Sequence, residues 1–342
     1  MARRVLWGSL VLAPAALVAR YVFHLDPTVL FVLSALALVP LAWLIGEATD
    51  HVSEHTGPGI GGFLNASFGN APELIIALLA VADGLPGVVR GSLTGSVVSN
   101  ILLVLGFAMI IGGDGDVDTR SLRLQLACVV GAVVLLLIPS VPAWHGSHET
   151  HGLYLLSLPI AIVLLGGYVA ITVNNLRIHA GAERGEARGD AWSLPRALGW
   201  LSAATLATAF VSEVLVHSLH TFARAVGWGE FFIAVVIVAI VGNAAEHGGA
   251  ILIARRGNMK LATEIAISSS MQVAVFVMPA VALLSWIVGR GLPLSFRVVE
   301  VVTMAVAALV AGAFVWDGRS RRWEGIALVA VYALCVVWYA LA

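Results

Sequence analysis

The chain has 342 residues, of which 60% are hydrophobic and only 11% are charged, and its mean hydropathy is +0.96. This composition excludes a soluble globular domain and predicts an all-α polytopic membrane protein. The formal net charge is only −1, but lysine and arginine are unevenly distributed along the chain. The expected partner is therefore the lipid bilayer and not a nucleic acid, and the expected function is transport, signalling or membrane enzymology.

Apolar runs of about 20 residues are long enough to cross a bilayer. They predict about eleven transmembrane helices, at 5–23, 28–49, 59–82, 87–111, 121–139, 153–176, 197–222, 229–253, 262–287, 297–316 and 323–341. The first is interpreted as a retained helix and not a signal peptide, because no clear small-residue cleavage site follows it.

The longest hydrophilic segment divides the chain into two halves. The predicted organisation is an extra N-terminal helix at 1–23, a five-helix repeat at 24–176, a cytoplasmic linker at 177–196 and a second five-helix repeat at 197–342. Because each half has an odd number of spans, the repeats should be inverted relative to each other. Inverted repeats place a substrate site near the bilayer midplane, where discontinuous helices meet.

Lysine and arginine predict the orientation. If the N-terminus is cytoplasmic, fourteen of the 19 lie on inside segments and five on outside segments. This excess indicates a multi-pass protein of the cell inner (plasma) membrane, with its N-terminus in the cytoplasm and its C-terminus outside.

Two similar motifs interrupt apolar runs, one in each half. Residues 69–73 read GNAPE, and residues 242–247 read GNAAEH. Glycine weakens a helix, and Pro72 is tolerated only where a helical segment begins, so each motif predicts a break between two half-helices. A carboxylate at membrane depth costs at least about 2.5 kcal/mol and therefore marks a polar cavity or an ion path.

Further polar residues follow in the same order in both halves. An acidic residue precedes each motif, Glu47 in one half and Glu213 in the other, and a patch of hydroxyl and amide side chains follows each motif. These groups offer only oxygen donors, which hard divalent cations prefer, and Ca²⁺ takes six to eight of them. Without the ion, two facing carboxylates cannot both stay ionised at low cost, so cation and protons should compete for one site. A carrier that reorients only when loaded then exchanges cation for protons.

The paired motifs, 69–75 (GNAPELI) and 242–247 (GNAAEH), resemble the signature of the calcium/proton exchangers, a branch of the calcium/cation antiporter superfamily. The resemblance covers nearly the whole chain. It implies a secondary active Ca²⁺/H⁺ antiporter that works by alternating access, with no cofactor besides the transported Ca²⁺ and H⁺. It implies that Glu73 and Glu246 bind the metal and exchange protons. It also maps further metal-site residues onto Asn70, Asn243, Ser99, Asn100, Ser268 and Gln272.

The role of the other titratable residues stays open. Glu47 and Glu213 are candidates for proton coupling or gating, and equally for residues in contact with water at span ends. His247 is a candidate for proton transfer. Solvent exposure is the safer expectation for the histidines near span ends, which are His51, His55, His217 and His220. The segment 114–118 (DGDVD) is expected to be a solvated turn, since it lacks the glutamate of an EF-hand.

Other functions are compatible with parts of this pattern. A Na⁺(K⁺)/H⁺ or Na⁺/Ca²⁺ exchanger fits the same scaffold, although the sodium/calcium branch typically has GTS or GSS where this chain has GNA. A passive channel would need no opposing gradient. An intramembrane enzyme is disfavoured because the chain has no Cys–His or HExxH pattern. A homo-oligomer is left open.

Overall fold

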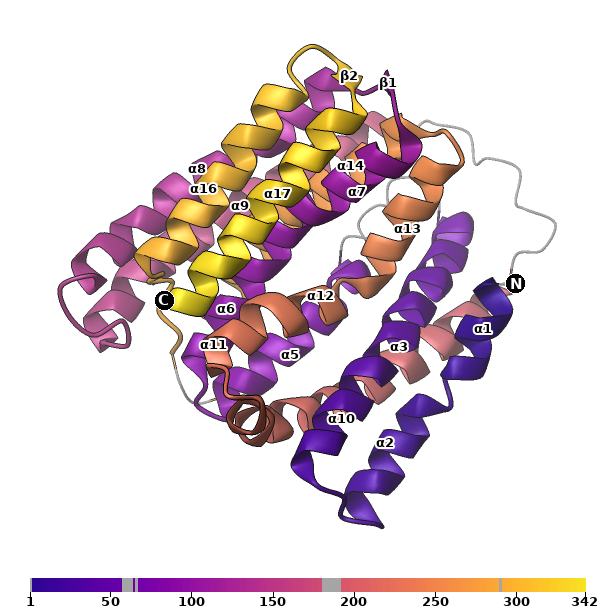
Figure 1. Cartoon of the computed structure of the whole chain (residues 1–342), viewed down its shortest axis with the longest axis vertical. Helices are drawn as coiled ribbons and strands as arrows, with labels where there is room; N and C mark the ends of the chain where they lie inside the picture. The colour runs from indigo at the N-terminus through magenta and orange to yellow at the C-terminus, as the bar shows by residue number, and fades with distance from the viewer. Residues whose placement is uncertain (1, 57–63, 65–66, 180–191, 289–290) are drawn as a thin grey trace.

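The computed structural model describes residues 2–56, 64, 67–179, 192–288 and 291–342. Most of the predicted linker at 177–196, and the predicted start of the third span at 59, therefore lie outside the described residues. Within the described part, the chain is almost entirely helical (Figure 1), which confirms the predicted all-α polytopic class.

The first half combines long helices with shorter helical segments. They are α1 (Ala2–Ser9), α2 (Leu12–Tyr21), α3 (Pro27–Thr56), α5 (Ala71–Ala82), α6 (Pro86–Val98), the π-helix η1 (Ser99–Val104), α7 (Leu105–Gly112), α8 (Thr119–Ala143) and α9 (His151–His179). The predicted N-terminal span at 5–23 is divided into α1 and α2 by a turn at Leu10 and Val11. Pro14 follows in the first turn of α2, where its missing N–H leaves no hydrogen bond unmade.

The second half repeats this pattern. Its helices are α10 (Leu194–Val226), α11 (Glu230–Phe232), the π-helix η2 (Ile233–Val238), α12 (Ala239–Gly242), α13 (Ala244–Arg255), α14 (Met259–Gln272), the π-helix η3 (Val273–Val277), α15 (Met278–Leu284), α16 (Val298–Phe314) and α17 (Arg322–Leu341). Two short strands, β1 (Gly115–Asp116) and β2 (Arg319–Ser320), pair antiparallel and join the halves at one end.

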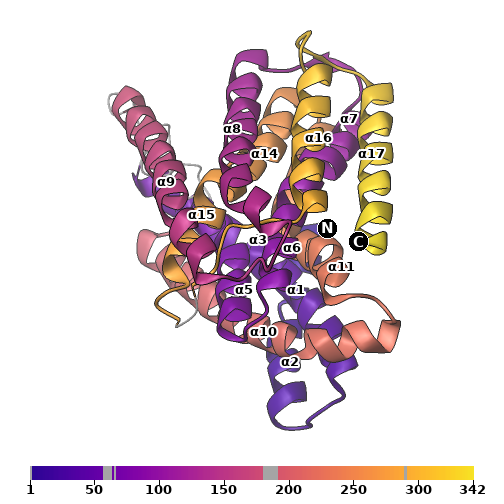
Figure 2. The same cartoon turned by 90° about the vertical axis from the view of Figure 1, so that its left-hand side faces the viewer.

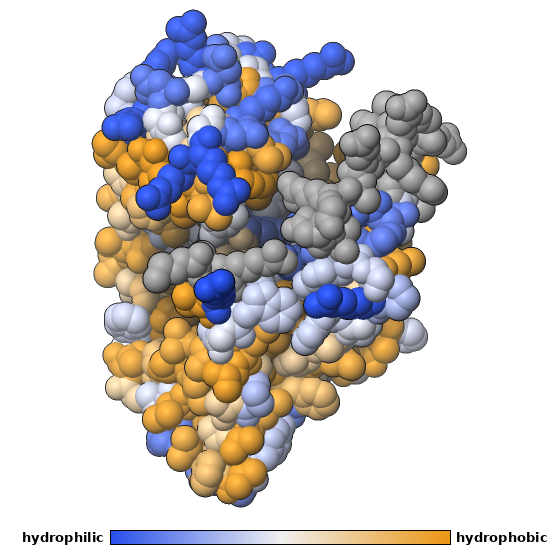
Figure 3. All heavy atoms as spheres, turned by 90° about the vertical axis from the view of Figure 1, so that its right-hand side faces the viewer, coloured by the Kyte–Doolittle hydropathy of each residue, from blue (hydrophilic) through white to orange (hydrophobic). Residues whose placement is uncertain are grey.

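Seven helices in the described residues are long and apolar enough to cross a membrane, or eight if α11–α12 and α13 count as one bent span. The other predicted spans consist of shorter helices, so the total of eleven stays a prediction. Figure 3 shows apolar side chains over large areas of one flank, with polar side chains at its upper end and across its middle. Apolar areas of this size are typical of a protein surrounded by lipid.

The helices form two groups. Helices α3 and α10 run antiparallel and pack along each other (Figure 1). In the second group, α8, α14, α16 and α17 stand side by side (Figure 2), with contacts between α8 and both α14 and α16. The helices that carry the motifs lie where the two groups meet, since α3 packs against α12 and α13 while α10 packs against α5.

Both predicted helix breaks are confirmed, and their backbones match. Residues 67–69 are helical, Asn70 forms a turn, and α5 begins at Ala71. In the second half α12 ends at Gly242 and α13 begins at Ala244, with a bend of 58°. The φ and ψ angles are −93° and 11° at Asn70 and −90° and 11° at Asn243. The same residue type thus adopts the same non-helical conformation at corresponding points of the two halves.

Candidate ion site at the helix breaks

Glu73 lies at the third position of α5, directly after the first break. Its side chain is buried, with 7% of the residue exposed, and it faces the second break. A Cβ atom placed on Gly242 would lie 3.3 Å from Glu73 Oε1. The absence of a side chain at position 242 therefore makes room for the Glu73 carboxylate.

Glu246 holds the corresponding position in α13 and opens onto a cavity of about 300 Å³. Gly69 of the first break borders this cavity together with residues of α3, so each glutamate lies beside the glycine of the opposite break. Glu73 Oε1 lies beside position 242, four residues before Glu246. The structure therefore brings both predicted carboxylates into one region inside the protein.

Asn100 is the centre of a hydrogen-bond network that joins the two halves. Its Nδ2 donates to Asn243 Oδ1 at 3.1 Å and to Ser269 Oγ at 2.9 Å. Its Oδ1 lies 2.9 Å from His247 Nε2. Asn243 Nδ2 donates to Ser96 Oγ at 2.7 Å and to the Ala239 carbonyl at 2.9 Å. Apart from the bond to Ala239, each of these contacts joins a residue of the first half to a residue of the second half.

A second amide pair also joins the two halves. Asn70 Nδ2 donates to Gln272 Oε1 at 2.7 Å, across 202 positions of sequence. Gln272 also lines the cavity beside Glu246, together with Ser268. Two predicted amides of opposite halves are thus paired next to the carboxylates.

Close helix packing places these groups. A Cβ atom on Gly95 would overlap the Val235 carbonyl oxygen and lie 2.7 Å from the Ala239 Cβ. Glycine at 95 therefore lets α6 touch the backbone of the second broken helix. The π-helices η1 and η3 begin at Ser99 and directly after Gln272, within the polar patches of the two halves. Such π-turns occur frequently at functional sites.

Some predicted residues lie outside this cluster. The Ser99 hydroxyl donates to the Ser96 carbonyl of its own helix at 3.4 Å. The Ser268 hydroxyl donates to the Ile265 carbonyl at 3.3 Å, although the residue borders the cavity. Glu47 of α3 lines the same cavity, whereas Glu213 of α10 does not. The structure thus separates the two acidic residues that precede the motifs.

Sequence reasoning missed several polar residues of the site. Ser269, and not its neighbour Ser268, donates to the Glu246 carboxylate. Ser96 and Asp50 were not selected, although Asp50 lines the cavity with Glu47. Ser96 precedes Asn100 by one helical turn, and this i,i+4 spacing was the available signal.

The expectation of a solvated histidine at position 51 is wrong. His51 is 9% exposed, and its ring stacks on Trp192 with centroids 4.5 Å apart. Trp192, from the predicted linker that precedes the second half, covers it, which the sequence around position 51 could not show. His55 Nε2 lies 2.7 Å from the Trp192 carbonyl. At the other end of the molecule His217 and His220 are exposed as expected, and they pair with Asp83 and Glu230.

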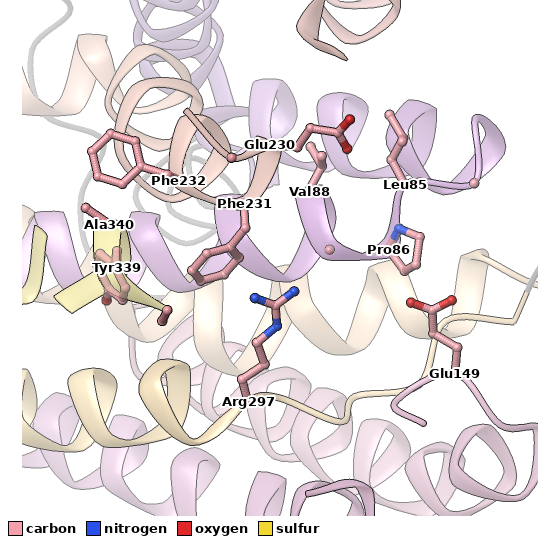
Figure 4. Close-up of a pocket in the computed structure, with 14 residues that line it drawn as sticks. Leu85, Pro86, Val88, Glu149, Glu230, Phe231, Phe232, Arg297, Tyr339 and Ala340 are labelled. Atoms are coloured by element: carbon pink, nitrogen blue, oxygen red, sulfur yellow. The ribbon is translucent and has the colours of Figure 1, made fainter. Parts of the chain in front are cut away.

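A second cavity, of about 520 Å³, lies between the α5–α6 turn, the start of α11 and the C-terminal residues (Figure 4). None of the predicted ligands lines it. Figure 4 shows the Arg297 guanidinium pointing toward Phe231, and it lies 4.7 Å from that ring centroid. Arg297 shares this lining with Glu149 and Glu230, so the charged groups of the cavity are of mixed sign.

A polytopic helical fold with two broken helices, each carrying a glutamate into a shared polar region, defines the class of membrane ion transporters. Within that class, a family model described as sodium/calcium exchanger protein matches residues 27–177 and 196–341, and the chain belongs to this family. The match covers nearly all of the chain.

Known relatives narrow the resemblance. The chain is 39% identical to the Ca²⁺/H⁺ antiporter ChaA of Bacillus subtilis (strain 168), covering 92% of this chain and 93% of that protein. It is 34% identical to the Ca²⁺/H⁺ antiporter of Aphanothece halophytica, covering 96% and 94%. The structure of native YfkE superposes with a TM-score of 0.83 at 36% identity, covering 96% of this chain and 97% of that one. The predicted resemblance to the calcium/proton exchangers is confirmed.

Proposed function

We propose that the chain is a secondary active Ca²⁺/H⁺ antiporter in which the metal and protons compete for Glu73 and Glu246. The observation that carries the proposal is the position of these glutamates, each in the first turn after a helix break and each beside the glycine of the opposite break. Two carboxylates match the charge of one divalent cation. Two relatives described as Ca²⁺/H⁺ antiporters support this choice over a Na⁺(K⁺)/H⁺ or Na⁺/Ca²⁺ exchanger.

The remaining ligands are proposed from the oxygen donors nearby. Asn70, Gln272 and Ser268 adjoin the carboxylates, and carbonyl groups at the two breaks are further donors. Ser99, Asn100 and Asn243 belong to the wider metal site that the resemblance predicts. No resident cofactor is proposed, because Ca²⁺ and H⁺ are the substrates.

The coupling follows from charge. An empty site with two ionised glutamates in a low-dielectric region is costly, so the site is occupied either by the cation or by protons. If only these loaded forms reorient, Ca²⁺ leaves as protons enter. Glu47, which borders the cavity, is proposed to relay protons toward Glu246, and Glu213 is proposed to do so when the opposite side opens.

The side from which the site is reached is part of the proposal. The cavity at Glu246 is lined by Trp43, Gly46, Glu47 and Asp50 in the C-terminal part of α3. Under the orientation that the cationic residues predict, this part of α3 lies toward the cytoplasm. We infer that the structure has its ion site open to the cytoplasm, with the N-terminus inside, the C-terminus outside and the protein in the inner membrane. The repeats proposed are 24–176 and 197–342, joined by the linker at 177–196 after the N-terminal helix.

Flux in liposomes tests the function. Reconstituted protein with an imposed pH gradient should take up Ca²⁺ in the absence of Na⁺. Glu73→Gln and Glu246→Gln should each abolish exchange, because glutamine keeps the shape of the side chain but neither ionises nor binds a proton reversibly. A matched control is Glu264→Gln, since Glu264 accepts hydrogen bonds from Ser121 and Gln125 away from the breaks.

Three outcomes would contradict the proposal. Na⁺ uptake with indifference to Ca²⁺ would indicate a monovalent exchanger. Ca²⁺ turnover coupled to protons in both glutamine variants would remove Glu73 and Glu246 from the mechanism. Ca²⁺ flux that ignores the pH gradient would indicate a channel.

A further inference from the structure

His247 follows Glu246 in sequence but its ring is directed elsewhere. The residue is 8% exposed, and its Nε2 lies 2.9 Å from Asn100 Oδ1 at the junction of α6 and η1. Glu246 borders the 300 Å³ cavity, while His247 is absent from its lining among the described residues. The imidazole is therefore placed to hold Asn100 and not to meet the water of the cavity.

One backbone carbonyl fixes the direction of the hydrogen bonds around Asn100. The Ala239 carbonyl can only accept, so the atom of Asn243 at 2.9 Å from it must be Nδ2. Asn243 Oδ1 then faces Asn100 at 3.1 Å, so this atom of Asn100 must be Nδ2 as well. Asn100 Oδ1 consequently faces His247, whose Nε2 must carry a hydrogen. The orientation of both amides and the donor nitrogen of His247 follow from a single acceptor.

The same reasoning continues to the carboxylate. Asn100 Nδ2 also donates to Ser269 Oγ at 2.9 Å. A hydroxyl has one hydrogen, and with Asn100 as its donor Ser269 directs that hydrogen to Glu246 Oε2. A directed chain thus runs from His247 through Asn100 and Ser269 to one oxygen of Glu246.

We propose that His247 is a positioning residue that acts on Glu246 through Asn100 and Ser269. By donating to Asn100 Oδ1 it prevents the amide from turning over, so that Ser269 holds Glu246 Oε2 and the second carboxylate oxygen is left for the ion. Asn100 then organises the site through its Nδ2 and does not offer its own oxygen to the metal. This inference rests on the proposed function, because its effect is on Ca²⁺ binding.

The test compares two substitutions at 247 by their Ca²⁺ dependence of uptake in liposomes. His247→Leu removes the donor and leaves Asn100 Oδ1 buried without it, and should raise the KM for Ca²⁺ by about tenfold with a smaller change in Vmax. His247→Gln can place an amide N–H near the same point and should bring the KM back to within about threefold of the wild type. If His247 instead shuttled protons, Vmax would fall in both variants, because neither leucine nor glutamine can shuttle protons.

A second variant tests the far end of the chain. Ser269→Ala removes the last hydroxyl and should raise the KM as His247→Leu does, and the double variant should be no worse than either single one, because both break one chain. The control is Ser218→Ala, whose buried hydroxyl bonds the Val214 carbonyl of its own helix. Its KM should match the wild type.

Different outcomes would refute the positioning role and the proposed function. Equal KM values for His247→Leu and His247→Gln, or additive effects in the double variant, would overturn the positioning role. If His247→Leu does not fold, an unchanged KM in Ser269→Ala alone overturns it. A wild-type protein that transports no Ca²⁺ would instead refute the proposed function, and this inference with it.

Discussion

Glu73 occupies space that a larger residue at position 242 would take. The distance of 3.3 Å between a Cβ at 242 and Glu73 Oε1 is tighter than ordinary van der Waals contact, so the carboxylate would have to move. The side chain can shift by a few tenths of an ångström, and the fold should therefore survive. The position of the Glu73 carboxylate relative to Glu246, however, should change.

Gly242→Ala is accordingly expected to raise the KM for Ca²⁺ by about fivefold to tenfold, the effect of about 1 kcal/mol or slightly more at the site. Uptake measured against Ca²⁺ concentration checks this. Gly131→Ala in α8 is the matched control, because a Cβ there meets nothing within 4 Å. A KM unchanged in Gly242→Ala would mean that Glu73 does not bind the ion from this position.

The sequence identified the two glutamates of the candidate site more directly than its hydroxyl groups. A glutamate next to glycine and asparagine in an apolar run is unusual enough to select Glu73 and Glu246 directly. Ser268 and Ser269 are adjacent and chemically identical, and only the rotation of α14 decides which of them faces Glu246. That rotation depends on packing between helices, which no local pattern encodes.

At the scale of elements, the two helix breaks were predictable and the π-helices were not. Glycine before asparagine, with Pro72 following, is a local signal for a break. The segments 99–104 and 273–277 are mostly apolar in sequence, and a π-turn inside such a run leaves no residue pattern. The divided N-terminal span escaped prediction because its apolar run is continuous through the turn at Leu10 and Val11.

The start of α8 offers a test of how one element is held. Asp118 caps this helix by accepting from the Ser121 backbone N–H at 3.2 Å, and it pairs with Lys260 at 3.2 Å. The Ser121 bond first, and the Lys260 side chain second, hold the pKa of Asp118 below its usual value. A lowered pKa stabilises the folded state above the unfolded pKa, and this contribution is lost as the pH falls through the folded pKa.

Asp118→Ala should therefore lower the melting temperature at pH 7, and the deficit should narrow below about pH 4. Thermal unfolding in detergent at several pH values measures it. Asp118→Asn keeps a capping oxygen and should lose less. A deficit of equal size at pH 3 and pH 7 would show that the charge of Asp118 does not contribute.

For the whole molecule, the sequence predicted the class and the pairing of the halves, while orientation stays a prediction. Sidedness can be read with single cysteines in a background without Cys128 and Cys335, both of which are free thiols. Lys260 and Glu149 have side chains 68% and 55% exposed and lie at opposite predicted sides.

In intact cells, an impermeant thiol reagent should label Glu149→Cys and leave Lys260→Cys unmodified until the membrane is opened. The expected contrast is about tenfold or more in labelling, because a charged reagent does not cross the hydrocarbon core. The opposite pattern would invert the proposed orientation, and equal labelling of both would contradict a fixed topology.

The two glutamates differ in their contact with water. Glu246 borders a cavity of about 300 Å³, whereas Glu73 lines a space of only about 10 Å³. In this conformation Glu246 therefore has more room for water beside it than Glu73 has, and a proton from the bath is expected to reach Glu246 first. Because the proposed repeats are inverted relative to each other, reorientation of the transporter should exchange these assignments. A different glutamate would then exchange protons first with each compartment, and neither carboxylate would be in contact with both compartments at the same time.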